Sequence, residues 1–187
     1  MRCMNYQAKC PICRTQKHRT EMQSAMDALR LAEAKLHAHF RLKDAELYGA
    51  FVDNDFEWAC DACLQNGLAI PANAGAQVYT WYAHLAYGNT ELTCFSCGND
   101  FVFNKVEKQL WYEKLKLINT SVPNNCLACR KQIRQHKQEN TLLSQLLSKK
   151  KTELTREELE TIISIYEGWR KEEKAAFYRA ILRKLTH

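Results

Sequence analysis

Eight of the nine cysteines in this 187-residue chain form four Cys-x2-Cys pairs, and this pattern constrains the fold more than any other feature. The pairs are Cys10/Cys13, Cys60/Cys63, Cys94/Cys97 and Cys126/Cys129, and Cys3 is left over. A Cys-x2-Cys pair in a tight turn, called a knuckle below, presents two thiolates to one metal ion, and two knuckles complete a tetrahedron around Zn(II). Redox pairs and buried structural cysteines are the alternatives, but four knuckles favour metal binding in a reducing compartment. The pattern predicts two structural Zn(II) ions, with Cys3 an unligated thiol.

The residues that flank the knuckles indicate how they pair. The sequence "CPICRTQ" (10–16) resembles "CLACRKQ" (126–132), and "DFEWACDAC" (55–63) resembles "NTELTCFSC" (89–97). The chain therefore has two knuckle types, each used twice: an arginine type, with Arg directly after the second Cys, and a glutamate type, with Glu three residues before the first Cys. The simplest assembly places one knuckle of each type in each site. We expect the first site to consist of Cys10, Cys13, Cys60 and Cys63, and the second of Cys94, Cys97, Cys126 and Cys129.

Four short motifs follow one another between residues 87 and 134. They are Cys94-Phe-Ser-Cys-Gly98, Phe101-Val-Phe103, Gln109-Leu-Trp-Tyr-Glu-Lys114 and Cys126-Leu-Ala-Cys-Arg130. In these motifs the stretch resembles the bacterial family of probable zinc-ribbon domains, with the departure that Lys108 separates Glu107 from Gln109. The resemblance implies a ribbon that joins the third knuckle to the fourth, so that the first pairs with the second by exclusion. The N-terminal ribbon would then have its knuckle order reversed. The resemblance implies no particular activity.

Helical periodicity accounts for much of the remaining chain. Apolar residues recur at helical spacing from 20 to 48, and again from 155 to 167 and from 171 to 185, where Gly168 interrupts the pattern. We therefore predict a small α+β zinc-stabilised protein with two four-cysteine zinc ribbons, short β-hairpins, an inserted long helix and a C-terminal helical hairpin. The predicted domains are residues 1–86 with the inserted helix, residues 87–135, and residues 136–187.

A site closed by four cysteines has no open coordination position, so it cannot activate water. Its contribution is folding free energy, about 10–16 kcal/mol per site in small peptides. Four thiolates around one Zn(II) carry a net charge of −2, so two sites lower the formal +6 of the chain to about +2. Arg14 and Arg130, which directly follow knuckles, are expected to offset this local negative charge.

The positive charge is unevenly distributed. Residues 44–104 carry eight acidic side chains and no Lys or Arg, whereas residues 105–151 carry eleven basic and three acidic side chains. The candidate phosphate contacts are Arg130, Lys131, Arg134 and Lys137, because positions 130, 134 and 137 share one face of a helix. A solvated helix face is an equally good interpretation of these residues.

Two Trp-Tyr pairs, at 81–82 and 111–112, allow either core packing or base stacking. On a strand, adjacent side chains point to opposite faces, so one aromatic of each pair would face the core. Packing is the favoured interpretation, since the first pair lies in the acidic segment.

The sequence contains no H-E-x-x-H, P-loop, G-x-G-x-x-G or G-x-S-x-G motif. We therefore expect a non-enzymatic, cytoplasmic protein without a small-molecule substrate, a membrane span or an apolar signal sequence. The favoured function is a protein-interaction or scaffold module, as a subunit of a larger nucleic-acid-processing assembly. The alternative is direct, weakly sequence-specific nucleic-acid binding through the basic knuckles and the 130–137 helix.

Overall fold

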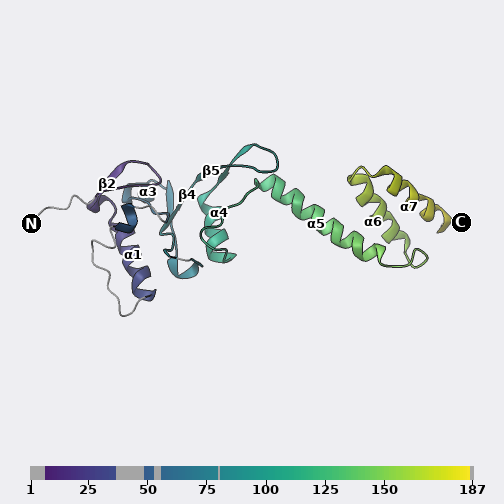
Figure 1. The fold of residues 1–187 in the computed structure, drawn as a ribbon, viewed down its shortest axis with the longest axis horizontal. Helices are drawn as coiled ribbons and strands as arrows, with labels where there is room; N and C mark the ends of the chain where they lie inside the picture. The colour runs from purple at the N-terminus through teal and green to yellow at the C-terminus, as the bar shows by residue number, and fades with distance from the viewer. Residues whose placement is uncertain (1–6, 37–48, 53–55, 80, 186–187) are drawn as a thin grey trace, which may run out of the picture. The chain divides into compact units, whose positions relative to one another are not determined.

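The computed structural model describes residues 7–36, 49–52, 56–79 and 81–185 (Figure 1). The chain divides into an N-terminal unit, Met1–Cys126, and a C-terminal unit, Leu127–His187. Cys3 and the second half of the helix predicted at 20–48 lie outside the described residues. Within the described residues, no helix is both long and apolar enough to cross a membrane.

The strands of the N-terminal unit are short and form two-stranded antiparallel sheets. They are β1 (Gln7–Lys9) with β2 (Gln16–His18), β3 (Ala69–Pro71) with β4 (Ala86–Gly88), and β5 (Thr90–Thr93) with β6 (Asp100–Phe103). The turns of the first and third pairs hold the Cys10/Cys13 and Cys94/Cys97 knuckles. Isolated hairpins of this length are at best marginally stable in water, so the pairs depend on what packs or binds beside them.

The N-terminal unit also contains short helices. They are η1 (Arg19–Glu21), α1 (Gln23–Leu36), α3 (Asp61–Gln65), η2 (Ala74–Ala76), α4 (Lys105–Gln109) and the π-turn η3 (Leu110–Lys114). Met22, Met26 and Leu29, which recur at helical spacing, are buried as that spacing predicts, whereas Leu31 is 67% exposed. The described part of this helix therefore buries one apolar face.

The largest core of the N-terminal unit surrounds the first two knuckles. Phe51 and Trp58 pack edge to face with ring centroids 5.2 Å apart, in the same cluster as Cys10 and Cys60. Gly88 in β4 lies so close to the first knuckle that a Cβ there would approach Ile12 Cδ1 to 2.2 Å. A second cluster, built on Tyr87, Phe103 and Tyr112, follows directly along the chain.

Trp111 and Tyr112 lie in η3 and not on the predicted strand. Asn104 caps the preceding helix α4 by accepting a hydrogen bond from the Glu107 N–H, which sets helical geometry from its first turn. Tyr112 is buried and its hydroxyl donates to the Ser121 carbonyl (2.8 Å). The helical cap thus overrides the strand preference of the aromatic residues.

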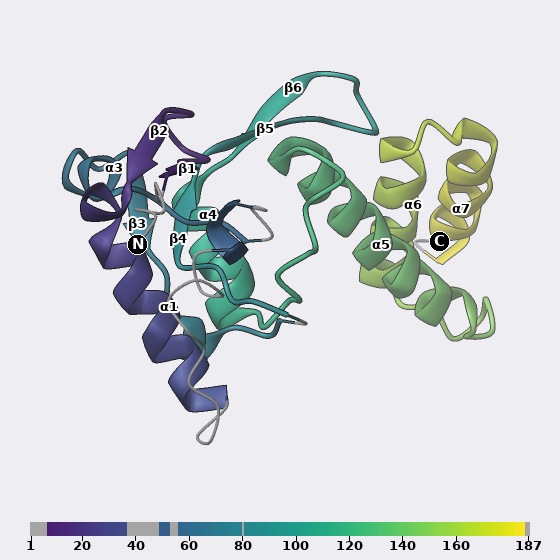
Figure 2. The same cartoon turned by 60° about the vertical axis from the view of Figure 1, so that its left-hand side comes forward.

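The C-terminal unit consists of α5 (Leu127–Leu147), α6 (Arg156–Gly168) and α7 (Glu172–Leu185). Figures 1 and 2 show α6 and α7 side by side, which confirms the predicted helical hairpin. A capping box begins α6: the Thr155 hydroxyl accepts the Glu158 N–H, and the Glu158 carboxylate accepts the Thr155 N–H (3.0 Å). Leu159 and Ile162 are fully buried in the core that the three helices share.

Candidate metal centres

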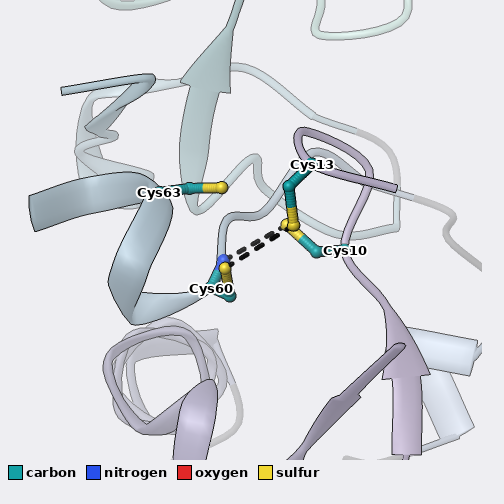
Figure 3. Close-up of side chains that lie close together, drawn as sticks. All are labelled: Cys10, Cys13, Cys60 and Cys63. Carbon is teal, nitrogen blue, oxygen red and sulfur yellow. Dashed lines mark hydrogen bonds between the residues drawn. The ribbon is translucent and has the colours of Figure 1, made fainter. Parts of the chain in front are cut away.

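The first four-cysteine group joins a hairpin turn to the beginning of a helix (Figure 3). Cys10 and Cys13 come from the β1–β2 turn, and Cys60 and Cys63 from the N-cap and first turn of α3. All four sulfurs lie within 4.8 Å of one another, and those of Cys13 and Cys60 are 3.9 Å apart. A tetrahedron of four 2.3 Å Zn–S bonds requires sulfurs about 3.8 Å apart, so the group fits Zn(II).

The second group is built in the same way. Cys94 and Cys97 lie in the β5–β6 turn, Cys126 directly precedes α5, and Cys129 lies in its first turn. The sulfurs again lie within 4.8 Å of one another, and those of Cys97 and Cys126 are 4.0 Å apart. The structure thus brings together the same two sets of four cysteines that the flanking residues predict.

The two hairpin knuckles have the same backbone geometry. The N–H of Arg14 donates to the Cys10 carbonyl (2.8 Å), and the N–H of Gly98 donates to the Cys94 carbonyl (2.9 Å). Both residues that follow a knuckle have positive φ, 58° for Arg14 and 72° for Gly98. Glycine adopts this conformation without cost, whereas arginine pays a steric penalty. Arg14 is therefore the structural counterpart of Gly98, at a position where the turn geometry favours glycine.

The two helix knuckles also match each other. The Cys60 N–H donates to the Cys10 sulfur (3.4 Å), and the Cys126 N–H donates to the Cys94 sulfur (3.2 Å). Both groups therefore run in the same order, a hairpin knuckle followed by a helix knuckle. The prediction that the N-terminal half has its knuckle order reversed is therefore wrong for the fold. Only the flanking residues are reversed, because Arg14 follows a hairpin turn whereas Arg130 lies on helix α5.

Hydrogen bonds prepare one thiol of each group to lose its proton. Burial raises the pKa of Cys94, but donors that include the Cys126 and Ser96 N–H groups outweigh it and lower the pKa to about 6. Burial likewise raises the pKa of Cys13, and hydrogen bonds from Thr15 help to lower it to about 6. Burial raises the pKa of Cys60, and the neighbouring Cys10 adds to the shift. A bound divalent cation is what makes four adjacent thiolates stable.

Two polar residues support the groups and were missed in the sequence. Asp61, inside the second knuckle, accepts the N–H groups of Gln23 and Ser24 (both 3.0 Å) and so caps α1. Asn125, directly before the fourth knuckle, accepts the N–H of Ser96 (3.0 Å) inside the third. The sequence shows that Asp61 and Asn125 lie beside cysteines. It gives no local signal for their hydrogen-bond partners, which are 29 to 38 residues away.

The candidate phosphate contacts all lie on α5. Lys131, Arg134 and Lys137 are exposed, whereas Arg130 is half-buried. Arg130, Arg134 and Lys137 share one face of the helix, as predicted from their spacing. The structure therefore offers three exposed cations along two turns of one helix.

His84 is buried, and both of its ring nitrogens are hydrogen-bonded. Its Nδ1 accepts the Glu57 N–H (2.9 Å), which leaves Nε2 as the donor to the Asn119 carbonyl (2.9 Å). Burial lowers the pKa of His84 below its usual value, so the ring is neutral at pH 7. Both ring nitrogens are already used in holding the loops together.

Residues 89–138 match the family described as the probable treble clef domain. The comparisons with curated proteins and with solved structures found no match. The matched range contains the hairpin knuckle, its β5–β6 strands and the knuckle at the beginning of α5. Geometry and family match agree on a treble clef-like arrangement in residues 89–138, with four cysteines placed to hold Zn(II), and its hairpin knuckle and helix knuckle recur in the N-terminal four-cysteine group.

Proposed function

We propose that this chain is a non-enzymatic interaction module, in which two structural zinc sites stabilise the fold and exposed surfaces dock a protein partner within a larger assembly. Closed four-thiolate sites leave no position at which a metal could bind and activate a substrate. In this proposal the protein acts in the cytoplasm, where thiols remain reduced.

The exposure of α5 supports this proposal most directly. Every side chain from Lys131 to Gln138 is exposed, although the helix is continuous to Leu147. Only further along do Leu143 and Leu146 enter the helical core. One open face of this helix consists of Gln132, Ile133, His136, Lys137, Asn140, Thr141, Ser144 and Gln145. Exposed helices that combine amide, hydroxyl and isolated apolar side chains suit docking to another protein.

Photo-crosslinking tests this proposal. A photoreactive residue at Gln132 or at Asn140, in the zinc-loaded chain, should crosslink the same protein partner from the source cell. The matched control is Ser164, which is exposed on α6 and should not crosslink that partner. Crosslinking that is equal at all three positions, or absent at the two α5 positions, would count against docking on α5.

Direct nucleic-acid binding is the second candidate, and the charge of α5 favours it. Between Leu127 and Gln138 the helix carries four basic residues and no acidic one. Each phosphate contact would add a slope of about −0.9 to the dependence of log affinity on log salt for duplex DNA. Three exposed cations therefore allow weak, steeply salt-dependent binding.

A titration against single- and double-stranded DNA and RNA, at low and physiological salt, tests this candidate. One variant replaces Arg130, Lys131, Arg134 and Lys137 by Ala, and a matched control replaces Lys150, Arg170, Arg183 and Lys184 by Ala. Binding that only the first variant abolishes would support phosphate contacts on α5. No binding at low salt, or equal loss in both variants, would eliminate a specific nucleic-acid face.

A further inference from the structure

Two loops of the N-terminal unit expose a group of large apolar side chains. Trp81 is 84% exposed and Leu115 is 57% exposed, although both belong to residue types that usually contribute to cores. We call this group the Trp81 surface, and its members are Val78, Trp81, Leu115, Leu117 and Ile118. Exposed apolar patches on ordered backbone mark interaction sites more often than isolated apolar residues do.

The two loops lie side by side because hydrogen bonds join them. Val78 and Ile118 form an isolated parallel bridge, and the Asn119 N–H donates to the Val78 carbonyl (3.0 Å). The Asn119 side-chain amide donates to the Tyr82 carbonyl (2.7 Å), and Asn119 itself is buried. The Lys116 ammonium also donates to the Ala76 carbonyl, which adds a further tie. The two loops that carry the exposed side chains are thus held together by hydrogen bonds.

The charges around this surface indicate what covers it. Residues 69–90 contain no Asp, Glu, Lys or Arg, and their one histidine, His84, is neutral. Residues 114–122 contain Lys114 and Lys116 and no acidic side chain. The neighbouring Glu113 is turned inward, where its carboxylate accepts the Asn73 N–H (2.7 Å). The exposed rim is therefore apolar and positive, and its electrostatic complement is apolar and negative.

We propose that the Trp81 surface docks a segment of a protein partner in which apolar side chains are flanked by Asp or Glu. This inference rests on the proposed protein-interaction function and adds the position and chemistry of the contact. Trp81 is the anchor, since it is the largest and most exposed side chain of the group, and Trp is enriched among the residues that dominate interface energies. A protein segment is favoured over a lipid surface because Leu117 and Ile118 are only 37% and 40% exposed, whereas insertion into a bilayer needs protruding apolar side chains.

The test uses a displayed library of random 16-residue peptides, selected on the zinc-loaded full chain. Enriched peptides should combine aromatic or aliphatic residues with Asp or Glu. A synthetic copy of an enriched peptide should bind at least tenfold more weakly to Trp81→Ser and to Leu117→Ser. Lys114→Glu should also weaken binding, and by a larger factor at low salt than at high salt. The matched control is Phe95→Ser, because Phe95 is 90% exposed on the third knuckle, outside these loops. Two bound zinc ions per chain show that each variant is folded.

The remaining outcomes separate this inference from the proposed function. Peptides that bind all variants equally would overturn the Trp81 surface and leave a protein-interaction function elsewhere. No enriched peptide, together with no crosslinked partner on α5, would overturn both. Trp81-dependent binding to vesicles of phosphatidylserine and phosphatidylcholine, without peptide binding, would replace the protein partner by a membrane. Concentration-dependent dimerisation that Trp81→Ser abolishes would replace it by a second copy of this chain.

Discussion

The Lys108 ammonium donates to the Glu57 carboxylate inside the N-terminal unit, and Lys108 is only 1% exposed. The same ammonium donates to the Thr90 hydroxyl (2.7 Å). Glu57 lies three residues before Cys60, and Thr90 lies four residues before Cys94. One buried cation therefore connects the segments that lead into the two four-cysteine groups. This places the ion pair where it couples the two halves of the unit.

Replacing Lys108 by Met should destabilise the zinc-loaded protein by about 2–4 kcal/mol, because removing one partner of a buried ion pair leaves the other without compensation. The expected loss is below the full range for such pairs because the Glu57 side chain is 27% exposed and can be partly hydrated. Denaturant unfolding, followed by the fluorescence of the buried Trp58, measures the change.

The matched control for this experiment is Lys114→Met, since Lys114 is exposed and lies only six residues further along. Its effect should stay within about 0.5 kcal/mol. Adding Glu57→Gln to Lys108→Met should recover part of the lost stability, because the unpaired carboxylate is then gone. Equal effects of Lys108→Met and Lys114→Met would show that the ion pair contributes nothing to stability.

Elemental analysis of the purified chain should find two zinc ions per molecule. Cys13→Ser and Cys97→Ser should each reduce the zinc content to about one, because three thiolates hold Zn(II) more weakly than four. Cys3→Ser should leave two, since each group already has four cysteines and a four-thiolate site is complete. A drop below two in Cys3→Ser would show that the ligand sets are different from those assigned.

Removing zinc with a chelator should unfold the N-terminal unit and leave the C-terminal helices largely intact. Zinc binding to a four-cysteine group contributes about 10–16 kcal/mol of folding free energy in small peptides. This is as large as the whole free energy of unfolding of a typical domain. The C-terminal core is built from residues such as Leu159 and Tyr166 and contains no cysteine. Circular dichroism should therefore show a loss of tertiary signal with most helix signal retained. Complete loss of helix signal would show that the C-terminal unit depends on the metal.

Features with a local signal in the sequence were predicted correctly. The apolar periodicity and the break at Gly168 predicted helices at 155–167 and 171–185, and the structure has them at Arg156–Gly168 and Glu172–Leu185. The four knuckles were predicted because each needs only four consecutive residues, and their repeated flanking residues indicated which knuckles share a site. The helix signals and the individual knuckles are thus local, whereas the pairing of knuckles was read from a sequence repeat.

Features that depend on distant partners were not predictable. Lys108 was noted only as a residue separating Glu107 from Gln109, and its partner Glu57 lies 51 residues earlier. The helix that contains Lys108 continues into the π-turn η3, and a π-turn holds one residue more than an α-turn. The sequence shows Lys108, but only the fold shows which carboxylate it reaches.

The helical C-terminal unit should lose stability as the pH falls below the usual glutamate range. The Lys149 ammonium, together with the Thr155 N–H, lowers the pKa of Glu158 below its usual value. The folded unit therefore binds this proton more weakly than the unfolded chain. Its contribution to stability is present above the unfolded pKa of about 4.3 and is lost as the pH falls through the lower folded pKa.

Thermal melts of the helix signal between pH 3 and pH 7, with a chelator present throughout so that zinc release does not contribute, measure this effect. Glu158→Gln should melt at a lower temperature than the wild type at pH 7, and the two should converge at pH 3. A difference that stays constant over the whole pH range would show that the charge of Glu158 is not responsible.

Asp61→Ala should destabilise the N-terminal unit by about 1 kcal/mol, because the first N–H groups of α1 then lose their acceptor. The loss should appear even though Asp61 is not a metal ligand, since its carboxylate binds Gln23 and Ser24 and not a cysteine. Asp61→Asn keeps one acceptor oxygen and should recover about half of the stability. Denaturant unfolding in excess zinc measures both variants. If Asp61→Ala lowered the zinc content instead, with unfolding otherwise unchanged, the residue would act on the metal group and not on the helix that it caps.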